Sequence, residues 1–149
     1  MTIVINMTII EKKVIGMKKR LFWLIISAAA LFAGALLYGL CRPDTYIGSF
    51  LGAIVSLRIS ADVPLYGFLS WYFPDYLWML SLTSALFAVY LPKGKGMMLL
   101  GGVSCAWGIL WEVGQQLEVV TGTADLWDVC MYIMAVISAA MINILKRGN

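Results

Sequence analysis

Residues 21–40 read LFWLIISAAALFAGALLYGL and carry no charged side chain over 20 positions. At a rise of about 1.5 Å per residue, roughly 20 residues of helix cross the hydrocarbon core of a membrane. Lipid offers the backbone no hydrogen-bond partners, so an isolated apolar segment of this length is stable there only as a helix. This stretch therefore predicts a transmembrane helix, and we expect it to be retained as an uncleaved anchor.

Three further stretches approach the same length and apolarity. The second begins at Pro74, a residue type favoured in the first turn of a helix. The third carries a single charged residue, Glu112, and the fourth carries a single one, Asp128, near its start. We therefore predict an all-α membrane protein with four transmembrane helices in a bundle, spanning about residues 21–40, 74–91, 97–117 and 126–145.

Residues 46–57 form a fifth apolar run, which is too short to span a membrane. Gly48 and Gly52 also weaken this run as a helix. We predict an interfacial or re-entrant segment in the first loop. The alternative is a tilted fifth span, which would reverse the topology of everything after it.

The composition agrees with a membrane protein and excludes several functions. Of 149 residues, 62% are hydrophobic and 13% charged, whereas soluble domains have about 45–50% and about 25%. A net charge of +3 is too small to indicate a nucleic-acid-binding surface. The absence of histidine excludes every mechanism that needs imidazole. The three cysteines lack metal-ligand spacing, and we interpret them as small packing residues.

The basic residues predict the orientation, because cytoplasmic loops are enriched in lysine and arginine. Alternate sides of the predicted topology hold nine and two basic residues. The larger group comprises Lys12, Lys13, Lys18, Lys19, Arg20, Lys93, Lys95, Lys146 and Arg147, and the smaller comprises Arg42 and Arg58. We expect a bacterial cytoplasmic membrane protein with both termini inside: a basic segment at 1–20, a membrane domain at 21–145 and a tail at 146–149.

The acidic residues lie mainly on the opposite side. Seven carboxylates are predicted at or near the outer surface, and only Glu11 is predicted in the cytoplasm. The outer group comprises Asp44, Asp62, Asp75, Glu112, Glu118, Asp125 and Asp128. Either the acids merely avoid the basic side, or they form a negative surface that has a function.

The third and fourth predicted spans each have one polar face. At about 100° per residue, one face of the third contains Gly101, Ser104, Gly108, Trp111, Glu112 and Gln115. The opposite face contains Val103, Ala106, Leu110, Val113 and Leu117. In the fourth, one face contains Asp125, Asp128, Tyr132, Ala135, Ala139 and Asn143. The connection from Glu118 to Asp125 is short, so we expect antiparallel neighbours that meet along these faces.

We therefore expect Glu112, Gln115 and Asp128 to converge just below the outer surface. Two carboxylates in a low dielectric need compensation: a proton, a divalent metal with oxygen ligands, a cationic group of a lipid or antibiotic, or Arg42 or Arg58. An acid inside a membrane helix indicates a functional site. Asp125 and Asp128 also fit a structural role at a helix start, Asp125 as the N-cap and Asp128 as the acid at position N3 of the first turn.

Four tryptophans project to the same predicted interface: Trp71, Trp78, Trp111 and Trp127. An aromatic belt is the ordinary explanation for tryptophan at this depth. The alternative is an aromatic wall beside the acids, which suits a cationic or sugar-bearing headgroup. We include Trp111 among the candidate ligand-binding residues because it precedes Glu112.

The sequence Glu112-Val-Gly-Gln115, a short turn and then Leu126-Trp127-Asp128-Val129 resembles the C-terminal signature of VanZ-like membrane proteins. That signature has E-x-x-Q, a turn with arginine, and then D-x-x-x-N followed by glycine. Phe73-Pro74-Asp75-Tyr76 is similar to the family's aspartate-bearing entry to its second span, and the resemblance covers roughly 73–140. The family arginine would fall near Gly122, the asparagine at Tyr132 and the glycine near Ala135, and none is retained.

The resemblance implies a small multi-span bacterial envelope protein, of a family linked to reduced susceptibility to teicoplanin. It carries over Glu112, Gln115 and Asp128, together with Asp75, as ligand-binding residues. We expect binding of membrane lipid and of a lipid-linked or cationic envelope molecule, with no nucleic-acid partner and no cofactor identified.

Two alternatives remain beside that function. One is a small proton-coupled multidrug exporter acting as a dimer, and the other is a non-catalytic scaffold subunit that uses its small-xxx-small motifs for helix contact. Because histidine, nucleophile and phosphate-loop motifs are all absent from the sequence, an enzyme is the least supported class.

Overall fold

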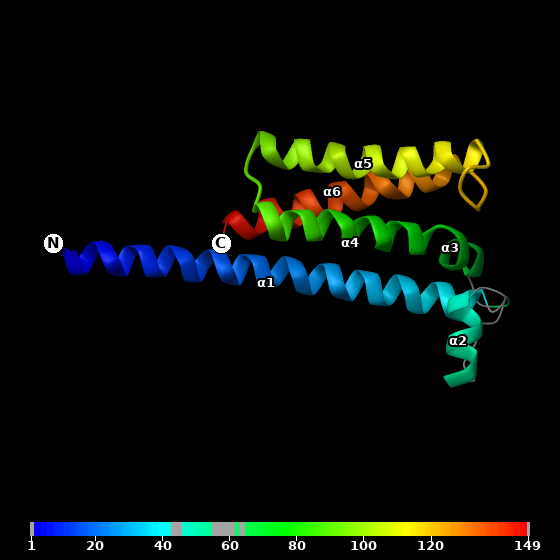
Figure 1. Ribbon diagram of the computed structural model, residues 1–149, viewed down its shortest axis with the longest axis horizontal. Helices are drawn as coiled ribbons and strands as arrows, with labels where there is room; N and C mark the ends of the chain where they lie inside the picture. The colour runs from blue at the N-terminus through cyan, green and yellow to red at the C-terminus, as the bar shows by residue number, and fades with distance from the viewer. Residues whose placement is uncertain (1, 43–45, 55–61, 63–64, 149) are drawn as a thin grey trace.

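The computed structural model describes residues 2–42, 46–54, 62 and 65–148. Within that part of the chain all regular structure is helical, which confirms the all-α class (Figure 1). The helices are α1 (Thr2–Cys41), α2 (Tyr46–Ile54), α3 (Tyr66–Trp71), α4 (Phe73–Tyr90), α5 (Lys95–Gln116) and α6 (Leu126–Gly148).

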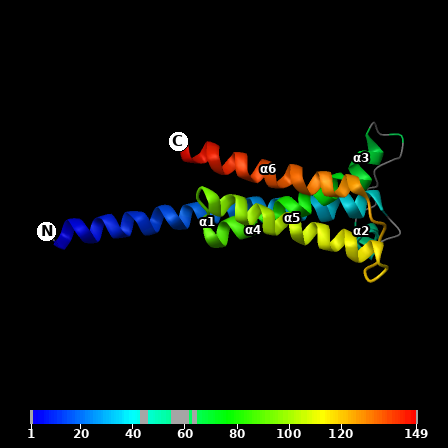
Figure 2. The same ribbon diagram turned by 90° about the horizontal axis from the view of Figure 1, so that it is seen from above.

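Four long helices, α1, α4, α5 and α6, run side by side along one axis (Figures 1 and 2). Helix α4 lies at the centre and packs against each of the other three. Its burial explains why Thr83, Ser84 and Phe87 are fully enclosed. A hydrogen bond between Ser27 Oγ and Ser81 Oγ, at 3.1 Å, joins α1 to α4.

In the part of the chain that the structure describes, three helical segments are long and apolar enough to cross a membrane: Lys13–Cys41, Lys95–Gln116 and Leu126–Lys146. The chain is therefore a multi-pass membrane protein, although three helices rather than the predicted four meet this criterion. Helix α4 has nearly the predicted bounds, but Ser81, Thr83 and Ser84 lower its apolarity. All three of these side chains are buried against neighbouring helices.

Helix α1 is longer than the span predicted at 21–40. It begins at Thr2 and continues without a break through the basic segment, so its first part projects beyond the other long helices (Figures 1 and 2). The only glycine in that part is Gly16, and no proline interrupts it. Because nothing in residues 2–20 breaks a helix, α1 continues through residue 20, where we expected the basic segment to end and the membrane span to begin.

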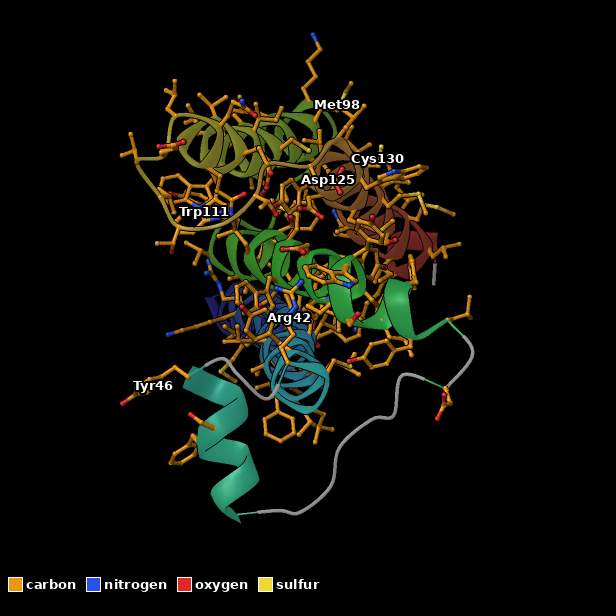
Figure 3. All side chains as sticks on the ribbon, turned by 90° about the vertical axis from the view of Figure 1, so that its right-hand side faces the viewer. Arg42, Tyr46, Met98, Trp111, Asp125 and Cys130 are labelled. Carbon is orange, nitrogen blue, oxygen red and sulfur yellow. The ribbon has the colours of Figure 1, made fainter. Side chains whose placement is uncertain are left out.

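Helix α2 lies within the predicted interfacial or re-entrant run at 46–57, of which residues 55–57 fall outside the described part. The helix runs crosswise to the long helices at the end of α1 and projects away from α4, α5 and α6 (Figures 1 and 3), a direction expected of an interfacial segment. Asp44 and Arg58 also lie outside the described residues. The short helix α3 was not predicted from the sequence.

Glycines allow the long helices to approach closely. A Cβ at Gly101 would lie 2.7 Å from Val136 Cγ1 on α6, and one at Gly108 would lie 2.5 Å from the Tyr132 ring. Gly102, next to Gly101, meets no atom within 4 Å and faces away from the bundle. The close contact between α5 and α6 therefore runs along one line of small residues.

Candidate functional site

The polar face predicted for α5 is the buried one. Gly101, Ser104, Gly108 and Glu112 are buried, while Val103, Leu110, Val113 and Leu117 on the opposite face are exposed. On α6 the predicted face is buried, but α5 covers only part of it: Tyr132 lies against Gly108 of α5, whereas Ala135 packs with Met79 of α4 and Ala139 with Phe87 and Ala88 of α4. The two helices contact one another and run antiparallel across their short connection (Figure 1), which confirms the predicted hairpin.

Glu112 is enclosed near the end of this hairpin, with 7% of its surface exposed. The Tyr132 hydroxyl donates to Glu112 Oε1 at 2.7 Å. The backbone N–H of Asp125 donates to Glu112 Oε2 at 3.1 Å. The side chain thus joins α5 to both the connection and α6, because each of its oxygens accepts a bond from a different segment.

Gln115 completes the bonding of Glu112. With its amide oriented to satisfy both ends, Gln115 donates to Glu112 Oε2 at 3.3 Å and to the Thr123 carbonyl at 3.2 Å. In that orientation its oxygen accepts from the Trp111 indole N–H at 3.1 Å. Three of the predicted site residues therefore belong to one hydrogen-bonded cluster.

The aspartates at the start of α6 have different roles. Asp125 Oδ1 accepts from the Trp127 N–H at 3.0 Å, which is the N-cap bond that the sequence indicates. Asp128 has a buried Oδ1 atom with no hydrogen-bond partner in the described structure. A buried acceptor without a donor is costly, so Asp128 has unused capacity to bind a cationic or hydrogen-bonding group.

These residues line a cavity of about 370 Å³ at this end of the bundle, and all five candidates predicted from the sequence are among its lining residues. The charged and amide members are Arg42, Asp75, Glu112, Gln115, Asp125 and Asp128. The aromatic members are Tyr38, Trp71, Tyr72, Trp78, Trp111 and Tyr132. Figure 3 views the molecule from this end, with Arg42 on one side of α4 and with Trp111 and Asp125 on the other.

Arg42 supplies the positive charge in the cavity lining. Its guanidinium lies 4.3 Å from the Trp71 ring centroid and 4.8 Å from that of Tyr38, and its Nε donates to the Ser70 carbonyl at 3.1 Å. It also interacts electrostatically with Asp75 and Asp128. The sequence left open which group balances the charge of the carboxylates, and among those candidates the structure places Arg42 in the cavity lining.

Three tyrosines line the cavity, Tyr38, Tyr72 and Tyr132, and none was predicted as functional. Tyr132 was assigned only to a helix face, although its position four residues after Asp128 placed it one turn deeper on the same side. Tyr72 lies between α3 and α4. Burial and the nearby carboxylates Asp125 and Asp128 raise the pKa of the Tyr72 phenol, so Tyr72 remains a neutral hydrogen-bond donor at physiological pH.

The four tryptophans predicted at this interface do lie at one end of the bundle. Trp71, Trp78 and Trp111 line the cavity, and the Trp127 ring lies 6.3 Å from that of Tyr72. All four are partly exposed. Three of the four tryptophans therefore form part of an aromatic wall beside the acids, and Trp127 lies outside the cavity lining.

A second cavity, of about 310 Å³, adjoins the first and shares Asp75, Trp78, Trp111 and Tyr132 with it. Its remaining lining is mainly apolar and comes from α4 and α5: Met79, Leu82, Trp107 and Gly108. The acidic cavity therefore continues into an apolar groove between these two helices. Within the described residues, no three cysteine or carboxylate side chains are arranged to hold a metal ion.

Comparison of the chain with family models, with curated proteins and with solved structures found no match. The class of the protein therefore rests on its fold and its cavity. It is an all-α, multi-pass membrane protein with an acidic, aromatic-lined cavity at one end of its bundle.

Proposed function

We propose that this chain is a VanZ-like bacterial envelope protein that binds a cationic, lipid-linked molecule from the outer leaflet of the cytoplasmic membrane. The observation that carries the proposal is the cavity around Glu112, which brings four carboxylates and one guanidinium together with six aromatic rings. Its volume of about 370 Å³ lies within the range of small-molecule pockets, about 300–1,000 Å³.

The charge of the cavity favours a cation. Asp75, Glu112, Asp125 and Asp128 against Arg42 give a formal excess of three negative charges when all are ionised. Aromatic faces beside carboxylates are the usual environment for alkylammonium groups. The unpartnered Oδ1 of Asp128 adds a carboxylate oxygen that the positive charge of an alkylammonium group can approach.

The adjoining groove favours a molecule that also has an apolar part. Met79, Leu82 and Trp107 line the groove, and they lead directly from Asp75 and Tyr132 of the acidic cavity. A ligand whose headgroup occupies the cavity has room for its chain between α4 and α5. An amphiphile therefore fits both cavities better than a free inorganic cation.

The distribution of charge supports four crossings with both termini inside. Helix α4 lies among three helices able to span, and it has similar length and direction (Figure 1). The α4–α5 connection, which bears Lys93 and is followed by Lys95 at the start of α5, lies at the end opposite the α5–α6 connection. Because basic loops remain in the cytoplasm, we place the acidic cavity at the outer surface.

The VanZ-like resemblance is supported by how its residues are arranged. Glu112 and Gln115 lie within hydrogen-bonding distance of one another, and Asp128 lines the same cavity. Tyr132, at the position of the family asparagine, donates to Glu112. Arg42 from α1 provides the guanidinium that this chain lacks near Gly122.

Binding of an alkylammonium tests the proposal. The protein in a neutral maltoside detergent is titrated with octyltrimethylammonium, and with octyl sulfate as the matched anion, while tryptophan fluorescence is followed. We expect saturable binding of the cation alone, weakened at least tenfold by Glu112→Gln combined with Asp128→Asn. Glu118→Gln, an exposed acid at the same end outside the lining, is the matched control and should leave the affinity unchanged.

Equal binding of the cation by the folded double variant would contradict the proposal. Proton-driven export of the cation from reconstituted vesicles would replace it with the exporter alternative. In cells, Glu112→Gln should also remove any change in teicoplanin susceptibility that expression of the parent protein causes.

A further inference from the structure

A third cavity, of about 510 Å³, lies at the end of the bundle opposite the acidic cavity. Three segments that are distant in sequence enclose it: α1, the α4–α5 connection and α6. Each segment contributes one lysine to the lining, namely Lys19, Lys93 and Lys146. The remaining lining is largely apolar and includes Ile15, Trp23 and Leu91.

The lysines face one another without a carboxylate. Lys19 and Lys146 are close enough to repel each other electrostatically. Lys146 Nζ lies over the Phe22 ring, 2.9 Å from its centroid. No acidic residue is among the described residues that line the cavity. Glu11 is the acidic residue that precedes Lys19 on α1. It lies two turns before Lys19, about 12 Å along the helix axis, so it is too distant to pair with Lys19.

The fold around this cavity is maintained by other side chains. Arg20 donates to the carbonyls of Ala88 and Val89, at 3.1 Å and 2.6 Å, and so attaches α1 to the end of α4. Asn143 donates to the Pro92 carbonyl at 3.3 Å, which attaches α6 to the same connection. Arg20 and Asn143 therefore attach the three segments to one another, while Lys146 adds its contact with the Phe22 ring. Among the described lining residues no acid balances the three lysines.

We propose that this cavity binds the phosphate of an anionic phospholipid. Basic pockets between membrane helices are suited to phosphate-bearing headgroups, and the three ammonium groups attract the single negative charge of a phosphodiester and can donate hydrogen bonds to its oxygens. The apolar wall formed by Ile15, Trp23 and Leu91 accommodates the start of an acyl chain, which a soluble phosphate lacks. The site is separate from the acidic cavity and does not depend on its function.

Native mass spectrometry of the detergent-solubilised protein tests this site, because no surrounding bilayer then contributes a diffuse attraction. The protein is titrated with phosphatidylglycerol and, in parallel, with phosphatidylcholine. We expect one tightly retained phosphatidylglycerol and at least tenfold weaker retention of phosphatidylcholine. Replacing Lys19, Lys93 and Lys146 together by glutamine should weaken phosphatidylglycerol binding on the order of a hundredfold, since each lysine contributes about fivefold.

A matched triple variant distinguishes specific binding in the cavity from nonspecific attraction of the lipid to the basic end of the protein. Glutamine at Lys13, Lys18 and Lys95, all exposed and outside the lining, removes the same charge from the same end and should change the affinity less than threefold. Equal loss in both triple variants, or equal retention of the two lipids, would overturn the proposal. Competition by glycerol phosphate as strong as by the whole lipid would assign the site to soluble phosphates instead. The single variant Lys93→Gln, in the exposed connection, provides a readout if the triple variant fails to fold.

Discussion

The replacement Tyr132→Phe tests whether the buried Glu112 carries a charge that the fold depends on. The Tyr132 hydroxyl donates to Glu112 Oε1 at 2.7 Å, and these side chains are 6% and 7% exposed. Removing the hydroxyl leaves a buried carboxylate oxygen without that donor. A hydrogen bond to a charged group contributes about 1.5–3 kcal/mol, whereas a neutral interhelical bond in a membrane protein averages about 0.6 kcal/mol.

We therefore expect Tyr132→Phe to lower the free energy of unfolding by about 2 kcal/mol. In a Glu112→Gln background the bond becomes a neutral one, and the same replacement should cost about 0.6 kcal/mol. The coupling energy of this double-mutant cycle is then about 1.4 kcal/mol. Equilibrium unfolding in mixed micelles, or steric trapping in a bilayer, measures all four free energies.

Tyr76→Phe is the matched control for this cycle. The Tyr76 hydroxyl forms a 3.0 Å hydrogen bond with Ser138 Oγ, so the same atom is removed from a neutral bond between α4 and α6. Its cost should be about 0.6 kcal/mol in either background. Equal costs for Tyr132→Phe with Glu112 and with Gln at position 112 would refute an ionised Glu112 as the acceptor.

Three further variants test the remaining parts of the account. Gly101→Leu should destabilise the protein by about 1–3 kcal/mol through overpacking against Val136, and the adjacent Gly102→Leu, in open space, should leave the unfolding free energy unchanged; equal effects would contradict the packing of α5 on α6. Asp125→Ala should cost about 1 kcal/mol because α6 loses its N-cap, while Asp125→Ser should retain the stability, as unfolding curves will show. Arg42→Gln should destabilise the fold by about 1 kcal/mol, because the partly exposed guanidinium that interacts with Asp75 and Asp128 is removed. Asp75→Asn in the same chain should restore part of that loss, and no recovery would mean that Arg42 does not stabilise the fold through the acidic residues.

The sequence predicts the α5–α6 hairpin well because two signals agree. The spacing of Gly101, Ser104, Gly108 and Glu112 is helical, so one face is identified without reference to any other segment. The short connection to α6 then leaves only an antiparallel neighbour. Convergence of Glu112, Gln115 and Asp128 follows from local geometry alone.

The features that the sequence did not predict depend on contacts between segments that are distant in the chain. Arg42 was one of two candidate arginines, and its approach to the cavity depends on how α1 packs against α4, which no short connection determines. Tyr132 was placed on the correct face of α6. Its hydrogen bond to Glu112, however, depends on how far α5 is shifted along α6, and the sequence does not determine that shift. The central position of α4 was hidden because burial on several sides removes the periodic pattern that an amphipathic helix has.

A single reporter thiol tests the proposal that the acidic cavity opens to the outer surface and accepts a cationic amphiphile. Thr121 is an exposed residue of the cavity lining, so Thr121→Cys in a chain with Cys41, Cys105 and Cys130 replaced by alanine gives one reporter thiol. We predict that an impermeant maleimide labels this thiol in intact cells, and that octyltrimethylammonium slows labelling while octyl sulfate does not. Labelling only after permeabilisation, or at a rate that the cation leaves unchanged, would contradict the account.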